Sequence, residues 1–221
     1  MPAIAVVGAG PGLGLSIGRV FGRQGFDVAL ISRSRENLDR LVAVLAEEGI
    51  TAAGFPADTA DPARLSAALA EAAQRFGGID VLEYSPYDGL VTVAPEQVTV
   101  DALRPEIEHI LYGAITATQA VLPAMLDAKS GTLLYTLGIG SVSPLPFLAT
   151  VNTAQAALRN WVHNLNGTLS DQGVHAADVA IGVMIGAEAP EGVPHRSSDD
   201  LAQIYWDLHT RRDLPEVVVT A

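Results

Sequence analysis

The chain has 221 residues, of which 49% are hydrophobic and 17% are charged, a composition that indicates one large globular core and excludes a disordered chain. Its formal net charge of −12 opposes non-specific binding to nucleic acid, and no uninterrupted apolar run reaches the roughly 18 residues that a membrane span needs. The absence of cysteine excludes disulfides, thiol nucleophiles and thiolate metal sites.

An apolar run over residues 4–7 leads directly into a glycine-rich loop, and helical periodicity begins at residue 15. This order predicts a strand, a tight turn and a helix whose free backbone N–H groups and positive dipole end suit a phosphate group. We therefore expect a nucleotide cofactor at Gly8, Pro11, Gly12, Leu13 and Gly14. Because a strand begins almost at the first residue, we expect no signal peptide and a cytoplasmic location.

Strand-like and helix-like segments alternate along the rest of the chain. Strands are expected at 27–31, 51–55, 79–83, 131–136, 174–183 and 217–219. Helices are expected at 35–48, 61–76, 101–127, 150–170 and 198–209. Asp61 and Pro62 form a typical helix start, and Pro105 is expected in the first turn of its helix.

This alternation predicts an α/β fold with one doubly wound, Rossmann-like parallel sheet and helices on both faces. The whole chain, 1–221, is expected to form a single NAD(P)-binding domain. Residues 186–212 contain prolines, aromatic residues and a histidine, and we expect this segment to cover a substrate.

The glycine spacing is Gly8-x3-Gly12-x-Gly14, whereas the general dinucleotide motif G-x-G-x-x-G needs a glycine where Leu13 stands. An Asp-Thr pair at 58–59 follows the third expected strand, and a Gly-Thr pair at 131–132 opens the fifth. With this order of elements, the pattern resembles the short-chain dehydrogenase/reductase family over nearly the whole chain.

The resemblance implies an oxidoreductase with a nicotinamide cofactor and a small-molecule substrate. It implies that Asp58 and Thr59 contact the adenine, and that Ser85, Gln155 and Met184 also lie at the cofactor. It further implies a homodimer or homotetramer that pairs through the helices at 101–127 and 150–170. Neither nucleic acid nor a membrane is expected as a partner.

The residues after the second expected strand favour NADP(H) over NAD(H). An acidic residue at this place binds the ribose hydroxyls of NAD, but this chain has Ser32, followed by Arg33 and Ser34. Arginine pairs with phosphate through charge-assisted hydrogen bonds. We therefore expect Arg33 to bind the 2′-phosphate of NADP(H), with Ser32 and Ser34 beside it.

The chain departs from the family at each catalytic position that the resemblance implies. The family uses an asparagine, a serine and a Tyr-x-x-x-Lys pair, and the matching positions hold Ile110, Gly138, Val151 and Gln155. In the family the tyrosine gives a proton to the carbonyl as hydride arrives, and the lysine lowers the pKa of the tyrosine. We therefore expect an atypical member without this catalytic set.

Tyr84 and Tyr135 are candidates for a replacement acid, although packing is the commoner role of a tyrosine in such a fold. Other polar side chains expected near the pocket are Tyr87, Asp88, His109, Tyr112, Ser141, Ser143, Asn152, Tyr205 and His209. No compact group of metal ligands stands out, so we expect no metal site.

Three functions stay open. The first is a divergent oxidoreductase that binds NADP(H) and acts on an unknown small molecule. The second is a catalytically inactive NADP-binding sensor or partner protein. The third, a cofactor-independent lyase or isomerase, is disfavoured because it would need neither the glycine loop nor Arg33.

Overall fold

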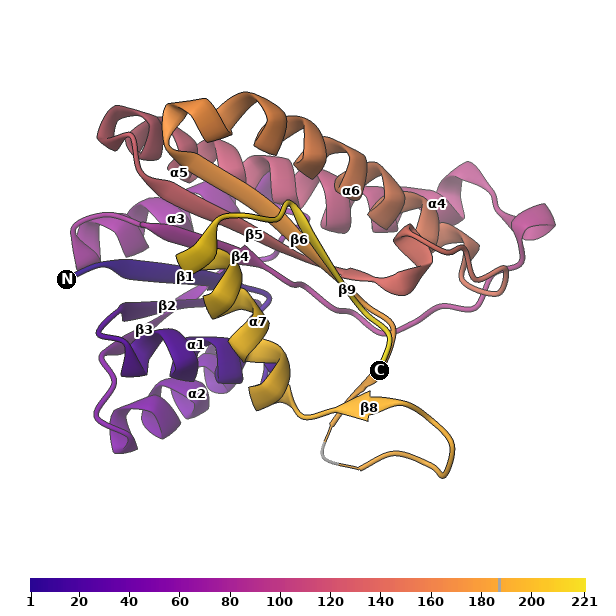
Figure 1. Ribbon diagram of the computed structural model, residues 1–221, viewed down its shortest axis with the longest axis horizontal. Coiled ribbons are helices and arrows are strands. Elements are labelled where there is room, and N and C mark those ends of the chain that lie inside the picture. Colours follow the sequence, from indigo (N-terminus) through magenta and orange to yellow (C-terminus); the bar gives the residue numbers. More distant parts are fainter. Residues whose placement is uncertain (187) are drawn as a thin grey trace.

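Seven parallel strands form the centre of the protein, in the order β3-β2-β1-β4-β5-β6-β9 (Figure 1). The computed structural model describes residues 1–186 and 188–221. The strands are β1 (Ala3–Val7), β2 (Asp27–Ser32), β3 (Ala52–Pro56), β4 (Val81–Tyr84), β5 (Gly131–Gly138), β6 (Val174–Ile181) and β9 (Glu216–Val219). The strand order reverses between β1 and β4, so the crevice at their carboxyl ends is the expected place for a ligand.

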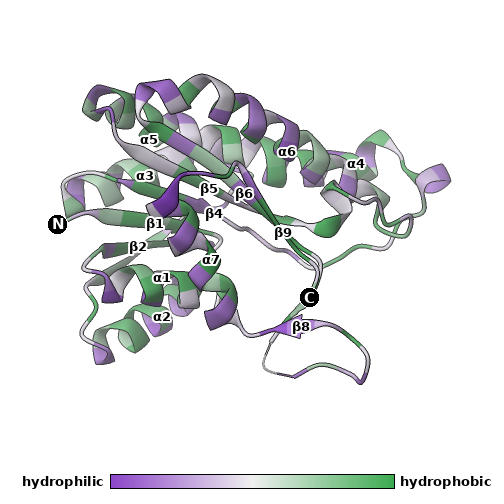
Figure 2. Cartoon of the chain, in the orientation of Figure 1, coloured by the Kyte–Doolittle hydropathy of each residue, from purple (hydrophilic) through white to green (hydrophobic). Residues whose placement is uncertain are grey.

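Helices cover both faces of this sheet, as the alternation of segments predicts. One layer contains α1 (Leu13–Arg23), α2 (Arg35–Glu47) and α7 (Ser198–Arg211), and the other contains α3 (Pro62–Phe76), α4 (Val100–Glu106), α5 (Gly113–Ala128) and α6 (Ala149–Leu169) (Figure 1). Each layer buries its own apolar cluster against the sheet. The inner strands are mostly apolar (Figure 2), because both of their faces are buried. The exceptions include Glu83 in β4 and His175 and Asp178 in β6, which are buried as well. The predicted doubly wound parallel fold is confirmed.

Local sequence signals set most element ends. Ser34 caps α2 by accepting a hydrogen bond from the Asn37 backbone N–H, and Asp61 caps α3, which Pro62 opens. Among the described residues, a short 3-10 turn follows β5 (Ile139–Ser141), another follows α6 (Ser170–Gln172), and a third, Pro95–Gln97, lies in the segment between β4 and α4. The strand limits shift by up to two residues from the expected ones: β3 ends at 56 instead of 55, β4 begins at 81 instead of 79, and β6 ends at 181 instead of 183.

The single helix expected at 101–127 is wrong in detail. It consists of α4, a π-helical turn η2 (Ile107–Tyr112) and α5, and Pro105 lies in the second turn of α4 because the helix begins at Val100. The Tyr84 hydroxyl donates a hydrogen bond to the backbone oxygen of His109 (2.5 Å). A Cβ on Gly113 would overlap this hydroxyl. A side chain inserted beside the helix explains the widened turn.

The helical segment Val100–Ala128 is long and apolar enough, by length and composition alone, to cross a membrane. In the fold, however, α5 lies against the sheet, and Ala114, Ala117 and Val121 are buried in the core beneath it. Core helices of soluble proteins pass the same test of length and composition.

Most of the segment expected to cover a substrate, 186–212, belongs to the scaffold. Helix α7 buries Leu201, Ala202 and Tyr205, and its Trp206 packs edge-to-face on Phe21 of α1 with ring centroids 5.2 Å apart. Ahead of α7, the short strands β7 (Met184–Ile185) and β8 (His195–Arg196) pair in parallel. Residue 187 lies outside the described residues. A covering role stays a prediction for the part that precedes α7.

Candidate functional site

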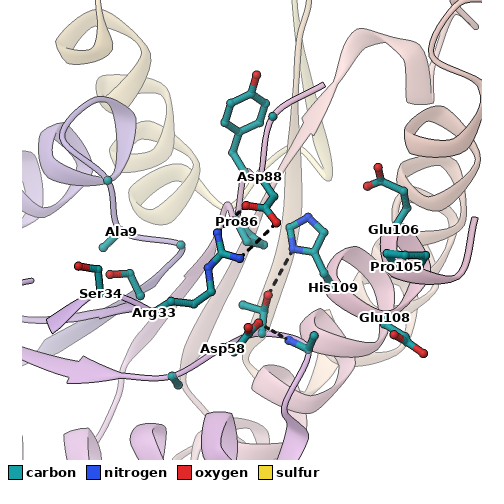
Figure 3. A pocket seen from close by; sticks show the side chains of 18 of the residues that line it. Ala9, Arg33, Ser34, Asp58, Pro86, Asp88, Pro105, Glu106, Glu108 and His109 are labelled. Carbon is teal, nitrogen blue, oxygen red and sulfur yellow. Dashed lines mark hydrogen bonds and ion pairs between the residues drawn. The ribbon is translucent and has the colours of Figure 1, made fainter. Parts of the chain in front are cut away.

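A cavity of about 520 Å³ opens at the carboxyl ends of β1, β2, β3 and β4. Helix α4 and the π turn close its far side (Figure 3). Its lining includes Gly8, Ala9, Gly10, Ser32, Arg33, Ser34, Asn37, Asp58, Thr59, Pro86, Tyr87, Asp88, Val91, Glu106, Glu108 and His109. The cavity therefore lies at the reversal of strand order, where the fold places ligands.

Gly8 brings the end of β1 close to the segment after β4. Its φ is +95°, and a Cβ at this position would lie 2.5 Å from Pro86 Cα. Its backbone N–H donates to the backbone oxygen of Ile31 (2.9 Å), which ties the loop to β2. Only glycine satisfies both the positive φ and the close approach.

The first turn of α1 offers unpaired donors at the same edge. The backbone N–H of Leu15 bonds to Gly10 and that of Ser16 bonds to Gly12. Among the described residues, the N–H groups of Leu13 and Gly14 have no protein acceptor, and no side chain caps the helix at Gly12. Free amides at the positive end of a helix dipole stabilise a bound phosphate.

Arg33, directly after β2, forms a two-pronged ion pair with Asp88 from the segment after β4 (Figure 3). Its Nη2 lies 2.5 Å from Asp88 Oδ1 and its Nη1 lies 3.2 Å from Oδ2. The pairing raises the pKa of Arg33 and lowers the pKa of Asp88. Both groups are therefore charged at neutral pH.

The neighbouring polar side chains fix the loop geometry around Arg33. The Ser34 hydroxyl accepts from the Asn37 N–H as the cap of α2, and Asn37 Nδ2 donates to the backbone oxygen of Ala9 (3.0 Å). The same amide lies 3.5 Å from the Ser32 hydroxyl oxygen. Asn37 thus joins the glycine loop, the end of β2 and the start of α2.

The opposite wall is acidic around one histidine. His109 Nδ1 lies 3.3 Å from the Thr59 hydroxyl oxygen, and burial lowers the pKa of His109, which keeps it neutral at pH 7. Burial, together with the charge of Asp88, raises the pKa of Glu106. Asp58 accepts from the Ala60 N–H through Oδ1 (2.9 Å). Arg33 is the permanent cation among the described lining residues.

The structure brings six of the residues predicted to bind the cofactor to one cavity: Gly8, Ser32, Arg33, Ser34, Asp58 and Thr59. Pro11, Gly12, Leu13 and Gly14 lie beside it at the start of α1, outside its lining. The Ser85 hydroxyl turns inward and donates to Glu83 (2.9 Å). Gln155 and Met184 also lie outside the lining.

None of the four positions matched to the family's catalytic residues contributes an ionisable side chain to the cavity. Ile110 lies in the π turn and is 6% exposed, and Val151 is 8% exposed in α6. Gln155 Oε1 accepts a hydrogen bond from the Gly138 backbone N–H (2.9 Å), so these two positions bond to each other.

The structure does not bring Tyr84 or Tyr135 to the cavity. Both side chains have no exposed surface: the Tyr84 hydroxyl bonds to His109 O, and the Tyr135 hydroxyl bonds to Thr118 Oγ1 (2.6 Å). Burial raises the pKa of each. They are packing residues that satisfy buried polar groups.

Sequence reasoning named Tyr87, Asp88 and His109 among the polar side chains expected near the pocket, and all three line it. It missed Asn37, Glu106 and Glu108. Asn37 stands three residues after the Ser34 cap. This spacing places it in the first turn of the helix, close to the end of the second strand, and could have indicated that it lies near the pocket. No local signal indicates the two glutamates, because the π turn sets where they face.

Among the described residues, one group could hold a metal ion by distance: His163, Asp178 and Glu216. Arg159 donates to both oxygens of Glu216 (2.5 and 2.9 Å), and His163 Nε2 lies 3.1 Å from Asp178 Oδ2. The guanidinium already neutralises this cluster and binds the carboxylate that a cation would need. The expectation of no metal site stays a prediction.

The family model for short chain dehydrogenases matches residues 2–191. The chain is 28% identical over 177 residues to dehydrogenase/reductase SDR family member 4 of Sus scrofa, which covers 78% of this chain and 62% of that protein. It is 29% identical over 188 residues to 2-(S)-hydroxypropyl-CoM dehydrogenase 3 of Xanthobacter autotrophicus, which covers 82% of this chain and 71% of that protein. The chain thus spans less than two thirds of the first relative.

Solved structures share the whole fold at low identity. An L-sorbose reductase from Gluconobacter frateurii complexed with NADPH and L-sorbose has a TM-score of 0.88 at 18% identity, covering 99% of this chain and 94% of that chain. An actinorhodin polyketide ketoreductase variant with NADPH has a TM-score of 0.89 at 21% identity, covering 99% and 95%. Since the family model also spans most of the sheet and the glycine loop, the chain belongs to the short-chain dehydrogenase family.

Proposed function

We propose that this protein is an NADP(H)-dependent oxidoreductase that acts on a small molecule. The observation that supports this proposal is the position of Arg33. It lies in the cavity where the strand order reverses, next to the N–H groups of Leu13 and Gly14, which have no protein acceptor among the described residues. The amides suit the diphosphate of the cofactor and the guanidinium suits its 2′-phosphate. The L-sorbose reductase and the ketoreductase with NADPH, which share the fold, support the same cofactor class.

We further propose that the chain is a divergent member that works without the family's Tyr-x-x-x-Lys pair. Reduction of a ketone needs a proton as well as hydride, and Val151, Gln155, Gly138 and Ile110 supply no acid. Hydride addition to a cationic carbon, such as that of an iminium ion, completes the bond without a proton. When bound, NADPH supplies the hydride. Substrates with a cationic carbon, such as protonated imines, are therefore favoured over neutral ketones.

The cofactor proposal is tested by titration calorimetry with NADPH and NADH. We expect NADPH to bind at least about tenfold more tightly, since one charge-assisted hydrogen bond contributes about 1.5–3 kcal/mol and 1.4 kcal/mol is tenfold. Arg33→Ala should remove this difference. Arg35→Ala is the matched control, because Arg35 donates to the Gly54 oxygen and lies outside the cavity lining. Equal affinities in the unaltered protein would show the proposal to be wrong.

The oxidoreductase proposal is tested by nicotinamide absorbance with aldehydes, ketones, enones and imines. We expect turnover with imines under conditions in which they are protonated, and little with simple ketones. Lack of turnover across the whole panel, with nucleotide binding intact, would favour the second candidate.

The second candidate is a nucleotide-binding sensor or inactive partner of an active relative. It is favoured by the hydrogen bond between Gln155 and Gly138, which joins two of the family's catalytic positions to each other. It predicts NADPH binding without turnover and an association with another protein that depends on the cofactor. Pull-down with and without NADPH from the native cell distinguishes the two candidates.

A further inference from the structure

The carboxylate of Asp88 occupies the face of Arg33 that a phosphate would use. The two residues are 55 positions apart, yet both guanidinium Nη atoms contact the two carboxylate oxygens, at 2.5 and 3.2 Å. This parallel, two-pronged arrangement is the one in which arginine binds phosphate oxygens. Figure 3 shows the Asp88 and Arg33 side chains pointing toward each other, joined by dashed lines. A ligand phosphate and Asp88 therefore cannot both hold this face of the guanidinium.

The pair can open. The Arg33 side chain is 58% exposed and that of Asp88 is 60% exposed, and ion pairs in such contact with water are weak. Asp88 lies in the segment after β4, where no helix or strand begins before residue 95 among the described residues. Arg33, in contrast, is held at the end of β2, which pairs with both β1 and β3. Opening therefore moves Asp88 and leaves Arg33 in place.

The rest of the cavity strengthens the competition. Asp58, Glu106 and Glu108 line the cavity together with Asp88. Among the described lining residues, Arg33 is therefore the one permanent cation beside four carboxyl groups. A 2′-phosphate that enters gains one guanidinium and meets the charge of Asp88 directly beside it. A ribose hydroxyl carries no charge, so it neither displaces Asp88 nor is repelled by it.

We propose that Asp88 is a specificity-determining residue of the cofactor site, which holds the Arg33 guanidinium in the free protein and must release it before a 2′-phosphate binds. The inference rests on the proposed binding of NADP(H) in this cavity. In this proposal Asp88 lowers the affinity for NADP(H), whereas Arg33 raises it. NAD(H) leaves the ion pair closed.

The test is titration calorimetry with adenosine 2′,5′-bisphosphate and with 5′-AMP, which differ only in the 2′-phosphate. Asp88→Asn should tighten binding of the bisphosphate by about tenfold and change binding of AMP by less than about twofold. Glu108→Gln is the matched control, because it removes a lining carboxylate that makes no ion pair with Arg33 in the described structure. It should give less than about a threefold gain.

The double variant Arg33→Gln/Asp88→Asn distinguishes the effect of breaking the Arg33–Asp88 ion pair from the effect of removing a negative charge from the cavity. In the Arg33→Gln background the gain from Asp88→Asn should fall to about threefold or less, the size expected for removing any lining carboxylate, as in Glu108→Gln. Unchanged bisphosphate affinity in Asp88→Asn, or an equal gain with Arg33 removed, overturns the assignment of Asp88 while leaving NADP(H) binding intact. If neither the unaltered protein nor Asp88→Asn binds bisphosphate or NADPH, with thermal unfolding showing both folded, the proposed function itself fails and the assignment falls with it.

Discussion

Glu83 is a carboxyl group without exposed surface in the middle of the sheet. The Thr136 hydroxyl donates to its Oε1 (2.8 Å) and the Ser85 hydroxyl to its Oε2 (2.9 Å), while the Tyr205 hydroxyl of α7 bonds to Thr136 (2.6 Å). Burial raises the pKa of Glu83 to about 8, because two donors do not replace the water that an ionised carboxylate loses. Glu83 therefore holds its proton near neutral pH.

This raised pKa makes folding stability depend on pH. The folded state binds the Glu83 proton more tightly than the unfolded state does. The contribution of this proton to the free energy of unfolding is therefore complete below about pH 4.5 and is lost as pH rises through about 8. Glu83→Gln cannot ionise, so its stability should not carry this pH dependence. Its advantage over the unaltered protein in free energy of unfolding should be larger at pH 9 than at pH 5 by about 4 kcal/mol. Denaturant unfolding at the two pH values measures this. The exposed Glu47→Gln is the control, and a pH-independent difference would contradict the prediction.

At the scale of elements, the π turn determines which side chains of the long helical segment face the cavity. It places His109 on the cavity side and Ile110 in the core. The turn depends on two groups outside it, the Tyr84 hydroxyl and the missing Cβ of Gly113. The element thus has its shape from packing against β4, and its own sequence contributes little.

Gly113→Ala should therefore destabilise the protein by about 2 kcal/mol or more, because the new methyl group overlaps the Tyr84 hydroxyl and lies 2.8 Å from the Thr59 backbone oxygen. Tyr84→Phe alone should cost about 1 kcal/mol for the lost hydrogen bond. In the double variant the cost should be less than the sum, since the hydroxyl clash is gone. Strictly additive unfolding free energies would refute this account of the turn.

These elements also show what a sequence can predict. The buried strands and the glycine loop were predictable, since parallel strands with two buried faces are short apolar runs and glycine marks a close approach. The π turn was not, because its cause lies 25 positions away at Tyr84. The Arg33–Asp88 pair was not predictable either, since its partners are brought together only because β2 and β4 lie on either side of β1 in the sheet. Arg33 itself lines the cavity, and its binding of a 2′-phosphate stays a prediction.

At the scale of the whole molecule, the layer of α4, α5 and α6 is where the family resemblance implies subunit pairing. Most of its large apolar side chains, such as Leu111, Trp161 and Leu165, pack against this chain's own core. Tyr112 instead is 54% exposed, and Val100 is 72% exposed. We propose that copies of the chain pair through this layer, as the family resemblance implies, and that Tyr112 lies in the contact.

Analytical ultracentrifugation should show a dimer or tetramer of the 23.0 kDa chain. Tyr112→Glu should shift this distribution toward the monomer, since a charge in an apolar contact is costly. Its melting temperature measured at low protein concentration should stay close to that of the unaltered protein. A monomer at all concentrations for the unaltered protein would contradict pairing through this layer.

The packing of α7 on α1 has a consequence for how the protein is made. Phe21 and Phe26 follow the glycine loop directly, yet the rings that cover them, Trp206 and His209, belong to the last helix. During synthesis the first strands leave the ribosome long before that helix exists. The apolar side of α1 that α7 covers is thus exposed until nearly the whole chain is translated, and exposed apolar surface of this kind makes a growing chain prone to aggregation.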